Sequence, residues 1–129
     1  MSEPTAEEGI AAIYRSYVET FNTGDGAAVA ALLAYPVMVG GSGHPPICIP
    51  DAPAYQRMIE DTFRQFKAMG WIRSQIDSIE TVATAGDTGI VAAHFSRYRA
   101  DGSQIERGSG HYVTIKRDGA WRIVAAIVA

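Results

Sequence analysis

The sequence predicts an α+β domain in which three N-terminal helices pack on a curved, mainly antiparallel sheet. Apolar residues recur at helical spacing before Gly70, and the period changes to two from Trp71 onward. Short Gly- and Asp-containing turns then divide the second half into consecutive strands. Helices and strands segregated in this way are typical of α+β proteins. We expect the sheet to curl around the helices as a cone that encloses an internal pocket.

The first helix is expected to begin after Thr5, which forms a capping-box pattern with Glu8. The buried stripe of this helix is Ile10, Ile13, Tyr14, Tyr17, Val18 and Phe21. Asp25 is expected to cap a second, short helix that runs through about Ala34 and is ended by Pro36. Asp51 caps a third helix that Gly70 closes.

Two short strands are expected at 37–39 and 47–49, joined by a Gly- and Pro-rich loop. Four longer strands are expected at about 71–84, 88–100, 105–117 and 120–128.

The turn Asp101-Gly102-Ser103-Gln104 sets the expected register of the third and second strands from the end. With Gly102 and Ser103 as the loop, partner numbers sum to 205, so that Arg99 faces Glu106. The pairs expected on one face are Ile90/Ile115, Ala92/Val113, His94/His111, Ser96/Ser109 and Tyr98/Arg107. A three-residue final turn is expected to add Ile115/Ile123, Val113/Ala125 and His111/Ile127.

We interpret the histidine-bearing face as the floor of the pocket. The opposite face carries Val91, Phe95, Tyr112, Val124, Ala126 and Val128. A face this apolar usually marks a protein interface, so we expect a homodimer formed through it.

The whole chain, residues 1–129, is expected to be one domain. No segment concentrates Lys or Arg and the net charge is −3, which disfavours nucleic-acid binding. No apolar run approaches membrane-spanning length, and the N-terminus lacks the pattern of a signal peptide. The single Cys48 fits a reducing compartment, so we expect a cytoplasmic protein without a membrane partner.

The segments 17–25 (YVETFNTGD) and 116–124 (KRDGAWRIV) carry a family resemblance. With their order and spacing, the chain resembles the nuclear transport factor two-like superfamily, which includes SnoaL-like polyketide cyclases and ketosteroid isomerase. The resemblance covers essentially the whole chain and identifies 1–129 as a single SnoaL-like domain. It implies a cone with a pocket, usually in a dimer, but no single function, because this fold serves isomerases, cyclases, dehydratases and binding modules.

Comparison with ketosteroid isomerase implies that Tyr17 corresponds to its oxyanion-hole tyrosine. The position of the general base falls near Gly40, Gly41 or Ser42, none of which can take a proton. The second oxyanion donor falls on His111. Steroid isomerisation by that mechanism is therefore disfavoured. Scytalone dehydratase uses paired histidines and tyrosines, which His94, His111 and Tyr17 resemble in residue type.

The predicted catalytic residues are His94 and His111 as an acid/base pair, with Tyr17 polarising a substrate oxygen. The predicted ligand-binding residues are Tyr14, Ser96, Tyr98, Arg107, Ser109, Val113 and Ile127. No metal site and no cofactor are expected; Asp77 is the one further metal ligand considered. His44 is interpreted as part of a surface loop, and Cys48 as packing.

Two functions stay open. The first is binding of a small apolar oxygenated compound with isomerase, cyclase or dehydratase chemistry. The second is a non-catalytic ligand-binding or dimerisation module. The histidine pair favours the first, and the missing carboxylate base favours the second.

Overall fold

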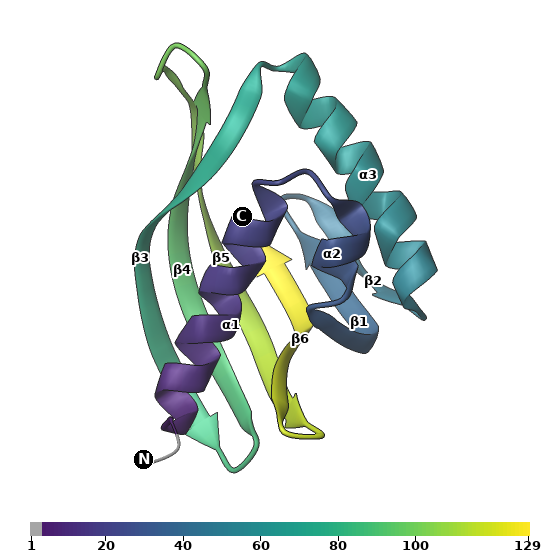
Figure 1. The fold of residues 1–129 in the computed structure, drawn as a ribbon, viewed down its shortest axis with the longest axis vertical. Helices are drawn as coiled ribbons and strands as arrows, with labels where there is room; N and C mark the ends of the chain where they lie inside the picture. The colour runs from purple at the N-terminus through teal and green to yellow at the C-terminus, as the bar shows by residue number, and fades with distance from the viewer. Residues whose placement is uncertain (1–3) are drawn as a thin grey trace.

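The computed structural model describes residues 4–129 and confirms the predicted order of elements (Figure 1). The elements are α1 (Ala6–Phe21), α2 (Gly26–Ala30), β1 (Leu33–Gly41), β2 (His44–Ile49), α3 (Ala52–Ala68), β3 (Trp71–Ala85), β4 (Thr88–Arg99), β5 (Gln104–Arg117) and β6 (Ala120–Val128).

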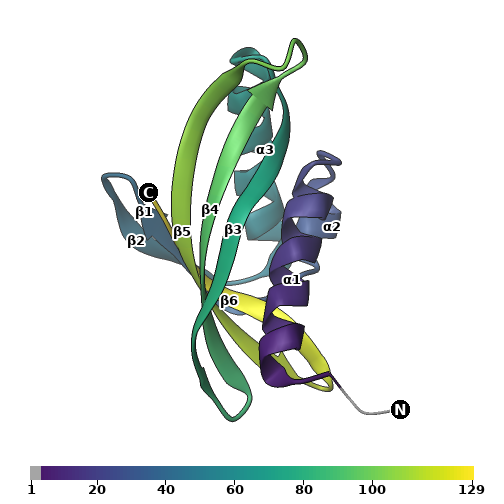
Figure 2. The same ribbon diagram turned by 90° about the vertical axis from the view of Figure 1, so that its left-hand side faces the viewer.

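The strands form one sheet in the order β2-β1-β6-β5-β4-β3. The pair β1–β6 is parallel and the other neighbouring pairs are antiparallel. The sheet curves strongly, and the three helices lie along its concave side (Figure 2). The predicted α+β class, with helices packed on a curved and mainly antiparallel sheet, is therefore confirmed.

All three predicted helix caps are confirmed. Thr5 Oγ1 accepts a hydrogen bond from the backbone N–H of Glu8, and the Asp25 and Asp51 side chains accept from backbone N–H groups in the first turns of α2 and α3. Helix α2 is shorter than predicted. It ends at Ala30 because the chain enters β1 at Leu33, which pairs with Ile123 of β6.

The predicted register of the β4–β5 hairpin is wrong by two residues. His94 lies opposite Ser109, and His111 lies opposite Ala92. The turn closes earlier than expected, because the N–H of Arg99 donates to the carbonyl of Ser103 at 2.8 Å, and an irregularity follows between Arg97 and Tyr98. A shift of two preserves the alternation of side chains, so both histidines stay on one face.

That face is the convex one, so the predicted assignment of inside and outside is also wrong. Val91, Phe95 and Tyr112 are buried under the helices, whereas His94 and His111 are exposed. Burying the aromatic and branched set removes more apolar surface from water than burying the histidine set, and this difference decides which face the helices cover.

The β5–β6 register agrees with the prediction far from the turn and departs from it near the turn. Val113 pairs with Ala125 and His111 with Ile127, as predicted. Nearer the turn, Ile115 pairs with Arg122 instead of Ile123, because a bulge after Val113 absorbs one residue of β6.

Candidate functional site

A cleft lies between the concave sheet face and helices α1 and α3. It consists of three adjoining hollows of about 60, 160 and 680 Å³, whose walls share Arg97 of β4 and Val128 of β6. The largest hollow opens at the cleft mouth and falls within the usual size range of ligand sites. The two smaller hollows extend the cleft toward the core.

Tyrosines form the polar part of the inner wall. Tyr14 and Tyr17 come from α1, Tyr55 from α3 and Tyr112 from β5. The rings of Tyr14 and Tyr112 have centroids 4.6 Å apart, and those of Tyr17 and Tyr112 are 5.9 Å apart. The i, i+3 spacing on α1 places the first two tyrosines on one helix face. Four phenols therefore lie in a mainly apolar wall.

Glycines of β5 make room for the aromatic rings on this face. A Cβ on Gly108 would lie 2.5 Å from Phe95, and one on Gly110 would lie 2.8 Å from the Tyr112 hydroxyl. Without side chains at these positions, the two rings can lie flat along the sheet beside the cleft.

Burial keeps these phenols protonated. Desolvation raises the pKa of Tyr14 to about 12, and it raises the pKa values of Tyr17, Tyr55 and Tyr112 above the ordinary tyrosine value. At neutral pH the four groups act as hydrogen-bond donors and acceptors without charge. They suit a ligand oxygen and cannot serve as strong bases.

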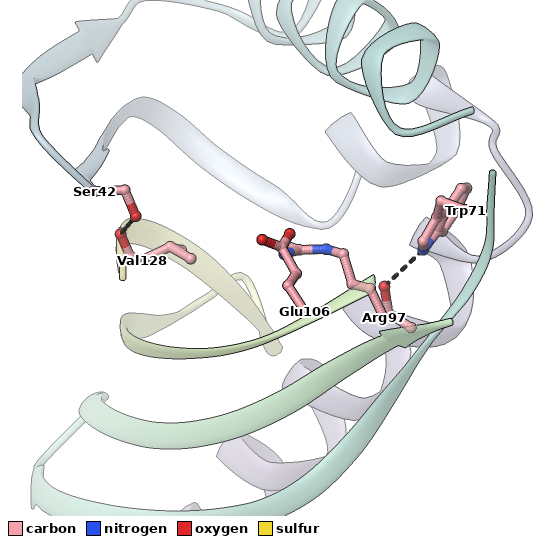
Figure 3. A network of polar contacts seen from close by, with 6 residues as sticks. Ser42, Trp71, Arg97, Glu106 and Val128 are labelled. Carbon is pink, nitrogen blue, oxygen red and sulfur yellow. Dashed lines mark hydrogen bonds and ion pairs between the residues drawn. The ribbon is translucent and has the colours of Figure 1, made fainter. Parts of the chain in front are cut away.

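Arg97 places a cation in the same wall. Its guanidinium carbon lies 4.5 Å from the ring centroid of Phe66 and 4.6 Å from that of Phe95. Its Nη1 donates to Oε1 of Glu106 at 2.5 Å, and Figure 3 shows the two side chains extending toward each other. Its Nε is buried and has no acceptor among residues 4–129.

The cleft mouth is formed by the β1–β2 turn, α3 and the start of β5. Ser42, His44, Gln65, Glu106 and Arg107 border it. The Ser42 hydroxyl donates to the carbonyl oxygen of Val128 at 3.1 Å, which ties the turn to the end of β6 (Figure 3). The interpretation of His44 as surface loop needs correction, because this residue begins β2 and lies beside the cleft.

The structure does not bring the three predicted catalytic residues together. Tyr17 lines the cleft. His94 and His111 are diagonal neighbours on the convex face, with the sheet between them and Tyr17. The expectation of an acid/base pair facing Tyr17 is wrong, because it depended on the inverted assignment of the faces.

The predicted ligand-binding residues divide in the same way. Tyr14 and Arg107 border the cleft, and the other five do not. Ser96 is buried elsewhere and donates to Asp77 at 2.5 Å, while Tyr98 stacks under Arg73. The remaining three, Ser109, Val113 and Ile127, lie on the convex face with the histidines.

Sequence reasoning missed Arg97 and Tyr112 as cleft residues. One signal was available, because Arg97 continues the period-two series of Val91 and Phe95. A cation on an otherwise apolar strand face indicates either an exposed strand end or a buried charge with a binding or structural partner.

Within residues 4–129, no three His, Cys, Asp or Glu side chains are grouped as metal ligands would be. None of the helices in this part of the chain is both long and apolar enough to cross a membrane.

Comparison with known proteins agrees with this architecture. The family described as NTF2-like protein (DUF6841) matches residues 6–129. The chain belongs to this NTF2-like family. No curated protein matches the sequence.

Several solved structures are similar to this NTF2-like chain in fold. An NTF2-like protein with a cystatin-like fold from Novosphingobium aromaticivorans is 19% identical, with a TM-score of 0.77 over 95% of this chain and 79% of the other. Aln2 from a Streptomyces species is 12% identical, with a TM-score of 0.78 over 99% and 92%. The yeast UBP3-associated protein BRE5 is 13% identical, with a TM-score of 0.76 over 98% and 97%. At these identities the likeness concerns the fold alone.

Proposed function

We propose that this NTF2-like protein binds a small apolar compound bearing one or two oxygen atoms in the cleft between sheet and helices. The observation that carries the proposal is a set of neutral phenols in a mainly apolar wall, behind an open mouth. Ligand sites commonly combine apolar walls with a few polar groups that fix orientation.

Isomerase, cyclase or dehydratase chemistry is the second candidate, and Tyr17 favours it. A neutral phenol in a desolvated wall can stabilise negative charge that develops on a ligand oxygen. Proton abstraction needs a base as well. Among the described residues, Glu106 is the carboxylate that borders the cleft, and it is paired with Arg97. The site is therefore better suited to binding than to proton transfer.

The partner of the convex face is a second copy of this chain. The helices leave this face uncovered (Figure 2). Met38 and Ile127 are 44% and 42% exposed there. Met38 pairs with Ala125, which pairs with Val113, while Ile127 pairs directly with His111. A contiguous apolar surface of this kind favours self-association. The face is the opposite of the one the sequence predicted, so Phe95 and Tyr112 do not belong to it.

Neighbouring alanines on β6 allow a matched test of ligand binding. Ala126 lines the cleft, whereas Ala125 pairs with Val113 on the convex face. Ala126→Leu places a larger side chain in the middle hollow and so reduces the space for a ligand. It should abolish binding of a neutral probe, acetylnaphthalene, measured by isothermal titration calorimetry. Ala125→Leu makes the same change outside the cleft and should leave the affinity within about twofold of the unmodified protein.

The outcome separates the cleft from other surfaces. Equal affinity in Ala126→Leu and the unmodified protein would place the probe elsewhere and contradict the proposal. So would the absence of measurable binding to the unmodified protein at the solubility limit of the probe.

A further inference from the structure

Arg97 is the charged group deepest in the cleft wall, and it borders all three hollows. Its side chain is 16% exposed, and its guanidinium carbon lies 4.5 Å from the ring centroid of Phe66 and 4.6 Å from that of Phe95. The contacts with these two rings hold the guanidinium in the wall and restrict the directions from which an acceptor can reach its N–H groups.

Arg97 has more N–H donors than the described residues supply acceptors for. A guanidinium offers five N–H groups in a planar fork, suited to two oxygens of one carboxylate. Among residues 4–129, Glu106 accepts only from Nη1, and it does so through one oxygen. The N–H on the buried Nε has no acceptor in this part of the chain. Burying a cation with so few partners is costly.

The partner is also the more exposed member of the pair. The Glu106 side chain is 45% exposed and borders the mouth hollow, whereas Arg97 reaches the inner hollows as well. Glu106 can rotate its carboxylate into water, where the charge is solvated. Arg97 has no comparable route, because the rings hold it in the wall.

We propose that the ligand of this cleft is an amphipathic carboxylic acid, whose carboxylate binds Arg97 in place of Glu106 and whose apolar body lies against the tyrosine-lined wall. This inference rests on the proposed function and narrows it to one chemical class. Glu106 then acts as a built-in competitor that neutralises Arg97 in the free protein.

Charge at the mouth agrees with this assignment. Arg107 borders the same hollow as Glu106, so a second cation lies near the entry route of an anion. The inner wall offers uncharged phenols, which suit the apolar end of the ligand and any hydroxyl or carbonyl on it.

A pair of nearly isosteric probes tests the carboxylate directly. Naphthoate and acetylnaphthalene share the ring system and differ in whether a carboxylate or a methyl ketone is attached. Calorimetric titration of the unmodified protein at neutral pH should show naphthoate binding at least about tenfold more tightly, as expected for added hydrogen bonds to a charged group.

Two variants identify the residues responsible. Arg97→Met keeps an unbranched side chain against the rings and removes the charge; it should bring naphthoate affinity down to that of acetylnaphthalene, whose binding persists. Glu106→Gln removes the competing charge and should tighten naphthoate several-fold without changing acetylnaphthalene. The second variant keeps Arg97 in place, so it tests the idea even if Arg97→Met does not fold.

Three outcomes are distinguishable. Equal affinity of the two probes for the unmodified protein overturns the inference and leaves the proposed function standing. A preference for naphthoate that is unchanged in both variants also overturns it, because the carboxylate then binds elsewhere. Failure of both probes to bind the unmodified protein contradicts the proposed function itself.

Discussion

The buried tyrosine hydroxyls should make the stability of the folded protein depend on pH in the alkaline range. Burial raises the pKa of Tyr14 from 10.0 to about 12. Its folded-state pKa lies above its unfolded value, so its contribution to stability is complete below pH 10 and is lost as the pH rises toward 12. The shift corresponds to on the order of 2–3 kcal/mol for this residue, which is 1% exposed.

Tyr14→Phe therefore should flatten the alkaline loss of stability. Thermal unfolding followed by circular dichroism should show the melting temperature of the unmodified protein falling steeply above pH 10. The melting temperature of the Phe variant should fall less over the same pH range, because this variant lacks the contribution of the Tyr14 hydroxyl. Identical alkaline profiles for the two proteins would show that the hydroxyl of Tyr14 is not held in a desolvated site.

The C-terminal end of α1 is joined to the sheet by a specific side-chain contact. Asn22, the C-cap of α1, binds the backbone of Ser74 in β3 twice: its Nδ2 donates to the Ser74 carbonyl at 2.9 Å, and its Oδ1 accepts from the Ser74 N–H at 2.7 Å. The Ser74 hydroxyl in turn accepts from the Trp71 indole at 3.1 Å. This pairing fixes the end of the helix that carries Tyr14 and Tyr17 over the cleft.

Asn22→Ala leaves two partly buried backbone groups of β3 without partners and should cost about 1–3 kcal/mol of unfolding free energy, measured by urea denaturation. Thr23→Ala, at the next position, removes two exposed hydrogen bonds of the hydroxyl, one donated to the Thr20 carbonyl and one accepted from the Asp25 N–H. It serves as the matched control and should cost less than Asn22→Ala, because water can replace exposed partners. Equal losses in the two variants would refute a special role for the Asn22 contact.

How well each element could be predicted depends on how far along the chain the residues that determine it lie from one another. The caps at Thr5, Asp25 and Asp51 depend on neighbours three residues away, so the sequence alone placed them correctly. The β4–β5 register depends on one irregularity beside Arg97, and such a bulge has no local marker here. Tyr17 could be predicted as a cleft residue from helix periodicity, but Arg97 could not be identified before the covered face was known.

At the scale of the whole molecule, the covered face follows from competition between two apolar strand faces. Alternation gives each β-strand two faces, and both faces of β4 and β5 carry apolar residues. Helices cover the aromatic-rich face, and the histidine face is left to solvent or to a partner. A charge introduced at Tyr112 would therefore lie in the core and could not report on association.

Ile127→Asp tests assembly on the convex face. Ile127 is 42% exposed and pairs with His111 on this surface, so a carboxylate there would be desolvated in a dimer but hydrated in a monomer. Sedimentation velocity at micromolar concentration should show the unmodified protein as a dimer and this variant as a folded monomer. Met69→Asp is the control, since Met69 is 43% exposed at the end of α3, away from the convex face, and should leave the dimer intact. A monomeric unmodified protein would refute self-association, and a dimeric Ile127→Asp variant would place the contact on another surface.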